Sequence, residues 1–190
     1  MSITTIIGPM FSGKTSELIR LIDRKRIADK KCLIIKHVGD TRFDIGTDVY
    51  HVTTHSNICY KKCDVLYLSV LDNIEPIVNK YNVVAIDEGF FFVNINDYCT
   101  KLASHGIDVI VASLDTSFKQ QLFPEIGKLI GNSEILIKLS AICMKCKTAD
   151  AIFTVRTIES EVEILVGGCD IYQSVCRACL NKSLNIISVA

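Results

Sequence analysis

The sequence has no excess of charge of either sign. Its 190 residues include 21 basic and 21 acidic side chains, so the formal net charge is +0. A dedicated nucleic-acid-binding domain usually carries a basic excess. The composition therefore argues against nucleic acid as the main partner, although it is compatible with a local basic patch.

Long apolar runs and leader sequences are missing as well. No run approaches the roughly 18 apolar residues that a membrane-spanning helix needs. The first ten residues, MSITTIIGPM, lack the basic segment and apolar stretch of a secretory signal. We therefore expect no membrane contact and a location in the cytoplasm. Disulfides are uncommon in such a reducing compartment, so the nine cysteines need another explanation.

Internal repeats, low-complexity tracts and long linkers are also absent, and the hydrophobic fraction of 49% suffices for an ordinary packed core. Short apolar runs alternate with helical patterns, which is typical of parallel strands joined by crossover helices. We expect an α/β fold with a doubly wound parallel sheet of the P-loop, RecA-like type. The expected strands are 3–7, 32–35, 83–86, 109–112 and 135–139, and the expected helices are 15–30 and 94–105.

The pattern changes after about residue 140. Segments 151–156 and 161–166 have the composition of a β-hairpin, and pairs of cysteines flank them. We expect two domains, an α/β nucleotide-binding domain at 1–139 and a small zinc-binding domain at 140–190. Residues 40–62 show no clear period and are expected to be rich in loops.

Residues 8–15, GPMFSGKT, match the phosphate-binding pattern G-x-x-x-x-G-K-[ST] at every fixed position. The glycines allow the backbone to aim N–H groups at phosphates, Lys14 reaches the β- and γ-oxygens, and the Thr15 hydroxyl is a Mg²⁺ ligand. A β-branched strand before the motif and an amphipathic helix after it are the expected context. The alternative is a glycine-rich turn that binds nothing. The residues expected to bind ATP are Gly8, Pro9, Met10, Phe11, Ser12, Gly13, Lys14 and Thr15.

Two adjacent acids follow the apolar run 83–86. Asp87 and Glu88 would stand where a phosphate loop needs a carboxylate for Mg²⁺, at the end of another parallel strand. One carboxylate can serve the metal while the other faces the acceptor hydroxyl. The alternative is that both acids simply begin a solvated loop.

Two C-x-x-C pairs, Cys143 with Cys146 and Cys176 with Cys179, can close a tetrahedral Zn²⁺ shell. Four thiolates leave no open position, so the metal would be structural. The alternatives are a redox dithiol and independent buried cysteines. The remaining cysteines are expected to be core or incidental thiols: Cys32, Cys59, Cys63, Cys99 and Cys169.

Together the phosphate loop, the IDEG stretch at 86–89 and the CMKC and SVCRAC stretches resemble the type II thymidine kinases, the small cytosolic-type family also carried by large DNA viruses. The stretches KCLIIKH, DTRF, VIVASLDTSF and VGGCDIYQSV are similar to the same family. The resemblance covers nearly the whole chain and is weakest over 44–82.

The resemblance implies transfer of the ATP γ-phosphate to the 5′-hydroxyl of thymidine, and of deoxyuridine, in nucleotide salvage. It implies Glu88 as general base, acting with Lys14, Arg42 and Asp87, and Mg²⁺ held by Thr15 and Asp87. The residues it adds to the ATP site are Asp40, Thr41 and Arg42. The residues it implies for the nucleoside site are Met10, Phe91, Leu114, Phe118, Phe123, Thr154, Glu163, Ile164, Leu165, Val166, Gly167 and Tyr172.

The family also implies a lasso that closes over the nucleoside, a homotetramer, and feedback binding of dTTP. Family members usually have Gln where this chain has Phe90, and their Asp-Gly-Thr-Phe is here Asp-Thr-Ser-Phe at 115–118. Read from the residues alone, the rings at 90–92 have plain core packing as an alternative, and Gly167 with Gly168 can be only a turn.

Two other functions compete with a nucleoside kinase. A RecA-like ATPase acting on nucleic acid would need a basic stripe with interleaved aromatic residues, which the sequence does not show. A non-enzymatic nucleotide sensor would not need Glu88. Release of ADP on adding thymidine, as against single-stranded DNA, distinguishes the three.

Overall fold

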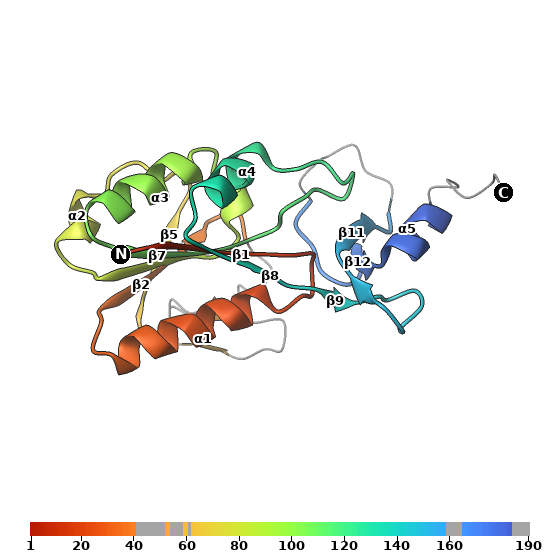
Figure 1. The fold of residues 1–190 in the computed structure, drawn as a ribbon, viewed down its shortest axis with the longest axis horizontal. Helices are drawn as coiled ribbons and strands as arrows, with labels where there is room; N and C mark the ends of the chain where they lie inside the picture. Colours follow the sequence, from red (N-terminus) through yellow and green to blue (C-terminus); the bar gives the residue numbers. More distant parts are fainter. Residues whose placement is uncertain (41–51, 54–58, 61, 159–164, 184–190) are drawn as a thin grey trace.

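A six-stranded parallel sheet forms the centre of the molecule (Figure 1). The computed structural model describes residues 1–40, 52–53, 59–60, 62–158 and 165–183, and of residues 52, 53 and 59 only the backbone. The strand order is β5-β2-β6-β7-β1-β8, and every neighbouring pair is parallel. The strands are β1 (Ile3–Ile7), β2 (Cys32–His37), β5 (Asp64–Leu68), β6 (Val83–Ile86), β7 (Asp108–Ser113) and β8 (Ile135–Lys138).

Helices cover both faces of this sheet (Figure 1). The helix α1 (Lys14–Ile27) buries Leu18 and Ile22 against one face, where Ile34 and Ile110 lie. The other face carries α2 (Glu75–Val78), α3 (Ile95–Ser104) and α4 (Pro124–Gly131). Central strands β1, β2, β6 and β7 are buried along almost their whole length and mostly apolar, because both of their faces are covered. The predicted α/β fold with a doubly wound parallel sheet is confirmed.

Because the strands are parallel, their carboxyl ends meet at one edge of the sheet, where ligands of such folds bind. The loop 8–13 follows β1 at this edge, and residues 87–88 follow β6. The segment 114–123 follows β7 between the sheet and α4. Sheet topology therefore brings three stretches that are distant in sequence to one place.

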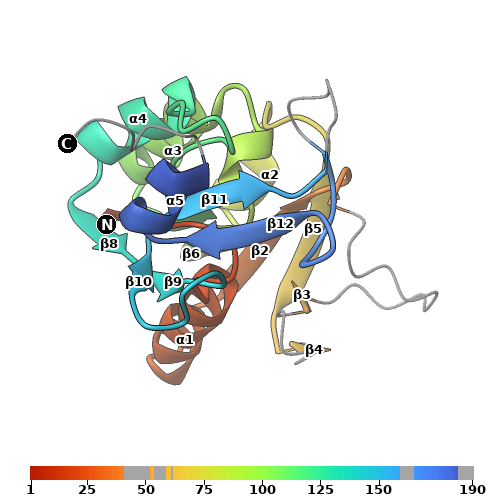
Figure 2. The ribbon, with the colours of Figure 1, turned by 90° about the vertical axis from the view of Figure 1, so that its right-hand side faces the viewer.

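The C-terminal residues form a separate small module beside that edge (Figure 2). It contains β9 (Ala141–Ile142) paired with β10 (Asp150–Ala151), and β11 (Phe153–Arg156) paired with β12 (Tyr172–Val175), followed by α5 (Arg177–Ser183). Its own apolar cluster includes Ala151, Val175 and Leu180. The division at residue 139 stays a prediction.

The predicted hairpin partner of β11 lies mostly outside the described residues. Within the described part, the strand β11 pairs with β12, with Arg156 opposite Tyr172. Of that expected strand, residues 165 and 166 are in no strand, and 161–164 lie outside the described residues.

Other differences are small. The helix α1 ends three residues earlier than expected, and β2 extends two residues further. The expected loop-rich stretch 40–62 contains β3 (Val52–Thr53) paired with β4 (Cys59–Tyr60); most of its other residues are outside the described part. A 3-10 turn, η1 (Gly89–Phe91), follows the two acids. Within the described residues, no helix is both long and apolar enough to span a membrane.

Candidate active site

The loop between β1 and α1 folds back on itself at the sheet edge. Gly8 has φ 151° and no room for a side chain, since a Cβ would lie 2.5 Å from the Leu139 carbonyl oxygen. Gly13 has φ 82° at the start of α1, in the left-handed region that glycine adopts without strain. These two glycines make the turn that points the helix amino terminus into the site, where anions are favoured.

Lys14 lies within this loop and is buried. Its ammonium donates a hydrogen bond to the Pro9 carbonyl oxygen at 2.7 Å, and the Ser12 hydroxyl donates to the same oxygen at 2.8 Å. The lysine therefore faces the concave side of the loop, where a phosphate oxygen could replace a carbonyl as its acceptor. The eight motif residues predicted to bind ATP, 8–15, lie together here; their role in binding stays a prediction.

Asp87 and Thr15 meet across the site. The Thr15 hydroxyl lies 3.2 Å and 3.4 Å from the two carboxylate oxygens of Asp87, which is almost fully buried. A hydroxyl and a carboxylate beside a phosphate loop are the oxygen ligands that Mg²⁺ takes from protein in such sites. The two predicted ligands are therefore close enough to share one ion.

Glu88 has an unusual backbone for its residue type. Its φ and ψ are 52° and 49°, the left-handed region, which costs a residue with a Cβ about 1 kcal/mol or more. Residues held this way concentrate at functional sites. The side chain is 8% exposed and lines the pocket described below, together with Lys14.

A buried ion pair lies behind Asp87. Lys36, at the end of β2, is 3.4 Å from the Asp40 carboxylate, and both side chains are at most 4% exposed. Burial lowers the pKa of the Lys36 ammonium, but the charges of Asp87 and Asp40 outweigh burial and raise that pKa above its ordinary value. Lys36 therefore stays a cation beside the two carboxylates. Sequence reasoning missed it; its place directly after the apolar run 32–35 was the available signal.

A pocket opens beside these groups, with an empty volume of about 620 Å³ that includes open solvent. Three aromatic rings form one wall: Phe90 and Phe91 are 4.4 Å apart between centroids, and Phe90 and Phe123 are 5.1 Å apart. His37 stacks behind Phe91 at 4.9 Å. The wall is flat and apolar and ends at Glu88, which suits a planar ring attached to a sugar hydroxyl.

The structure brings most of the predicted nucleoside-site residues into this one lining. They are Met10, Phe91, Leu114, Phe118, Phe123, Thr154, Leu165, Val166, Gly167 and Tyr172. Glu163, Ile164, Thr41 and Arg42 lie outside the described residues, and Asp40 is in the ion pair with Lys36. Lining residues that were not predicted are Phe90, Thr116 and Ser117. The last two could have been found from their place between Leu114 and Phe118.

The module reaches the pocket from the other side through β11 and residues 165–172. The backbone N–H of Met10 donates to the Thr154 hydroxyl at 3.0 Å, which joins β11 to the phosphate loop. The Tyr172 hydroxyl donates to the Leu165 carbonyl at 2.8 Å. Gly167 packs so closely on Ile171 that a Cβ would lie 2.3 Å from its Cδ1, so a side chain there would push the Ile171 side chain aside.

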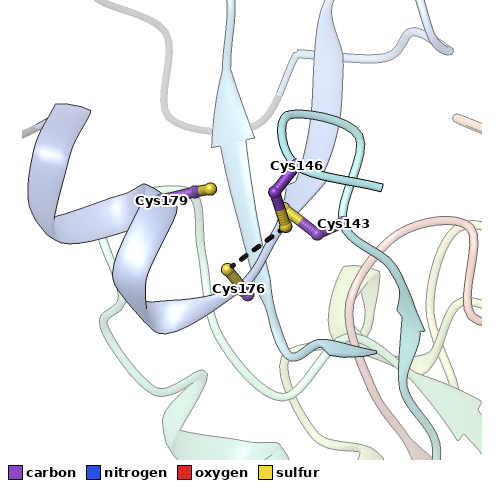
Figure 3. A group of neighbouring side chains, drawn as sticks. All are labelled: Cys143, Cys146, Cys176 and Cys179. Atoms are coloured by element: carbon purple, nitrogen blue, oxygen red, sulfur yellow. Dashed lines mark hydrogen bonds between the residues drawn. The ribbon is translucent and has the colours of Figure 1, made fainter. Parts of the chain in front are cut away.

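The four cysteines of the C-x-x-C pairs converge in the module (Figure 3). Their sulfur atoms all lie within 4.8 Å of one another, and those of Cys146 and Cys176 are 3.9 Å apart. Zn–S bonds of about 2.3 Å in a tetrahedron place sulfurs about 3.8 Å apart. The spacing therefore fits a zinc shell with little adjustment.

The electrostatics of the quartet also favour a cation. Burial raises the pKa of the Cys143 thiol, but backbone N–H groups of Cys146 and Cys176 outweigh it and lower that pKa to about 6. The pKa of the Cys179 thiol is raised to about 12, chiefly by its hydrogen bond with the Cys176 thiol. Four crowded thiols cannot all ionise without a positive charge between them. The quartet fits a structural zinc site with no open position.

The other cysteines are separate from the quartet. Cys32 and Cys99 are buried in the main core, Cys63 is half-buried and Cys169 is exposed. The side chain of Cys59 is outside the described residues.

Comparison with known proteins identifies close relatives. The family model described as "Thymidine kinase" matches residues 1–180. A thymidine kinase of Acanthamoeba polyphaga mimivirus is 59% identical over 99% of this chain and 86% of its own length. Thymidine kinase 1 of Dictyostelium discoideum is 41% identical over 96% and 79%, and thymidine kinase of raccoon poxvirus 44% identical over 93% and 95%.

Proposed function

Because the chain belongs to the thymidine kinase family, we propose that it transfers the γ-phosphate of ATP to the 5′-hydroxyl of thymidine. The products are dTMP and ADP, deoxyuridine is a second acceptor, and the pathway served is nucleotide salvage. One observation carries the proposal: a flat aromatic pocket runs directly into Glu88 and Lys14 at the sheet edge that holds the phosphate loop.

The phosphates would lie in the loop 8–13, with Lys14 against the β- and γ-oxygens and the amino terminus of α1 beneath them. Thr15 and Asp87 would hold Mg²⁺, which neutralises phosphate charge when bound. Arg42 would stabilise charge on the transferring group, with Asp40 and Thr41 beside it. Phosphoryl transfer requires mainly such positioning and neutralisation, because its transition state is loose.

Glu88 would orient the 5′-hydroxyl and accept its proton. Its left-handed backbone turns the chain away at the strand end, so the side chain lies in the pocket lining while Asp87 faces Thr15. Two adjacent acids therefore take different roles because the backbone sends their side chains to different neighbours.

The nucleobase would lie against the wall formed by Phe90, Phe91 and Phe123, with the remaining predicted nucleoside-site residues around it. Residues 163–167 and Tyr172 would form a lasso over it and exclude water that otherwise hydrolyses ATP. Zinc on the cysteine quartet would hold this lasso in place from the module.

The sharpest test is Glu88→Gln, which keeps size and hydrogen bonding but cannot accept the proton. Loss of a general base typically costs about 10²- to 10⁴-fold. We expect this loss in kcat for thymidine, with ATP affinity unchanged because the nucleotide is held by other residues. Near-normal kcat in this variant would place the base elsewhere.

Asp87→Asn is the matched comparison, one residue away and isosteric. We expect a weaker Mg²⁺-dependent step that excess metal partly restores, whereas added metal leaves Glu88→Gln unchanged. Single-stranded DNA replaces thymidine in a parallel assay. ADP release that follows DNA rather than thymidine would favour the nucleic-acid ATPase, and no ADP release with either would favour the nucleotide sensor.

We further propose a homotetramer in the cytoplasm. The edge strand β8 exposes Ile135 and Leu136, each nearly half exposed, and an uncovered apolar edge is commonly buried between subunits. A charge at this edge, Leu136→Lys, should lower the mass measured by light scattering. An unchanged mass would place the interface elsewhere. The exposed Val93→Lys on the other side of the sheet is the control.

We also propose feedback by dTTP. Its base would occupy the aromatic pocket and its phosphates the loop 8–13, so it would compete with both substrates. The reducing cytoplasm suits a thiolate quartet, because oxidation to disulfides would remove its ligands.

A further inference from the structure

The strand β11 presents two side chains on one face, two residues apart, to the main domain. Thr154 accepts the backbone N–H of Met10, as described above, and Arg156 lies further along the same face. Figure 2 shows β11 beside β12 at the front of the module. Whatever Arg156 contacts is therefore tied to the phosphate loop through a short rigid strand.

Arg156 contacts the pocket wall from outside. Its guanidinium carbon lies 3.9 Å from the ring centroid of Phe118, which lines the pocket from the segment after β7. Arg156 itself is not part of the lining. A cation this close over an aromatic face is attracted by the ring quadrupole and fixes the ring's orientation.

The same guanidinium holds the lasso side. Its Nη2 donates to the Tyr172 hydroxyl at 3.0 Å, and that hydroxyl donates to the Leu165 carbonyl at 2.8 Å. Charge-assisted hydrogen bonds of this kind are about twice as strong as neutral ones. Phe118, Arg156, Tyr172 and Leu165 thus form one continuous chain across the pocket mouth.

We propose that Arg156 is a positioning residue that locks the 165–172 segment against the Phe118 wall and so sets the affinity for the nucleoside. The inference rests on the proposed function. The residue stands outside the pocket lining and acts through Tyr172 and Phe118. Its planar fork serves two partners at once, one by stacking and one by hydrogen bonding, which lysine does only in part.

The test is steady-state kinetics of Arg156→Met in the full-length zinc-loaded protein. Losing a charge-assisted hydrogen bond corresponds to about tenfold in affinity or more. We expect the KM for thymidine to rise about tenfold, the KM for ATP to change less than about twofold, and ATP hydrolysis without thymidine to increase. Arg156→Lys should lie between the wild type and Arg156→Met.

Lys119→Met is the matched control, because Lys119 also lies over the Phe118 ring, at 5.6 Å, but is exposed on the surface. It should leave the KM for thymidine unchanged. An equal rise in this variant, or a KM in Arg156→Met within about twofold of the wild type, would overturn the inference.

Tyr172→Phe provides a second route that does not depend on how Arg156→Met folds. It keeps the ring in the pocket and removes only the shared hydroxyl. Because both substitutions break one chain, the fold-change of the double variant should be smaller than the product of the single ones. If the fold-change of the double variant equalled the product of the two single fold-changes, the two residues would act independently, and this would also overturn the inference. Failure of the wild type to phosphorylate thymidine would instead overturn the proposed function.

Discussion

The phosphate side of the site and its nucleoside side rest on cores of very different size. The phosphate loop and the two acids extend from central strands that are covered on both faces by α1, α3 and α4. The module that carries the lasso has six buried residues in its cluster, counting those the structure describes, and Cys143 and Cys176 are two of them. Half of the site is therefore held by apolar burial and the other half depends on its sulfur cluster.

This difference indicates how the two sides can be separated experimentally. A sheet with two buried faces is stable through many small contributions, so no single contact decides it. A module of about fifty residues with two-stranded sheets buries too little to fold alone and needs a metal or an equivalent crosslink. Damage to the metal site should therefore abolish nucleoside binding and leave ATP binding in place.

Zinc removal should produce the largest difference between the two regions. Structural zinc sites contribute about 10–16 kcal/mol of apparent binding energy, which is folding energy for the part they hold. We expect Cys176→Ser or a strong chelator to unfold residues 140–183 and abolish thymidine binding, while ATP still binds. Hydrogen exchange of the two regions, with metal analysis of one Zn²⁺ per chain, measures this.

Cys169→Ser is the control, because Cys169 is exposed and outside the quartet. It should behave as the wild type. If Cys176→Ser kept full protection in the module, or if the wild type held no zinc, the metal would not be what supports the lasso.

More of the main domain than of the module could be predicted from the sequence. The reason is again the larger apolar burial in the main domain. Strands such as Ile3–Ile7 and Val83–Ile86 are buried throughout and consist of β-branched and small apolar residues, so a short stretch of sequence is enough to predict them. The edge strand β5 alternates between exposed and half-buried positions, and α4 is short, so neither stood out from its pattern. In the module, β12 reads Tyr-Gln-Ser-Val, whose pairing with β11 depends on contacts that sequence does not display.

The candidate site divides in a similar way. Residues 8–15, Asp87 and Glu88 were predictable because phosphate and metal chemistry demands these types at fixed spacing. The nucleoside-site residues were predictable only through the family resemblance, since apolar walls have no spacing of their own. Lys36 and Arg156 were not found by either route. Both act through a neighbour, and such roles appear only once the neighbours are placed.

A core substitution in the main domain should have an intermediate effect. Leu102 of α3 is fully buried against the sheet, and Leu→Ala changes at such sites cost about 2–5 kcal/mol. We expect urea denaturation of Leu102→Ala to show this loss while zinc release from the module is unchanged. Ile27→Ala, at an exposed position of α1, is the control and should cost little. Early zinc release in Leu102→Ala would mean that the two regions unfold together.

The smallest expected effect lies at the end of the sheet farthest from the site. Asp108 begins β7 and accepts a hydrogen bond from the Lys25 ammonium at 2.5 Å. Burial raises the pKa of this carboxyl, but Lys25 and the amino terminus of Met1 together outweigh burial and hold that pKa below its usual range. Because the folded pKa is depressed, the carboxylate stabilises the fold above its unfolded pKa of about 3.9, and this stabilisation is lost as the pH falls through the folded value.

Asp108→Asn should therefore lower the free energy of unfolding by less than about 1 kcal/mol at pH 7, since the pair is partly exposed. In urea titrations at the lowest pH where the wild type still folds, the difference in free energy of unfolding between Asp108→Asn and the wild type should be smaller than at pH 7. Catalysis at pH 7 should not change, because Asp108 stands at the amino end of its strand and the site lies at the carboxyl ends. A change in kcat, or a difference that grows as the pH falls, would show that this ion pair acts on the site rather than only on the stability of the sheet.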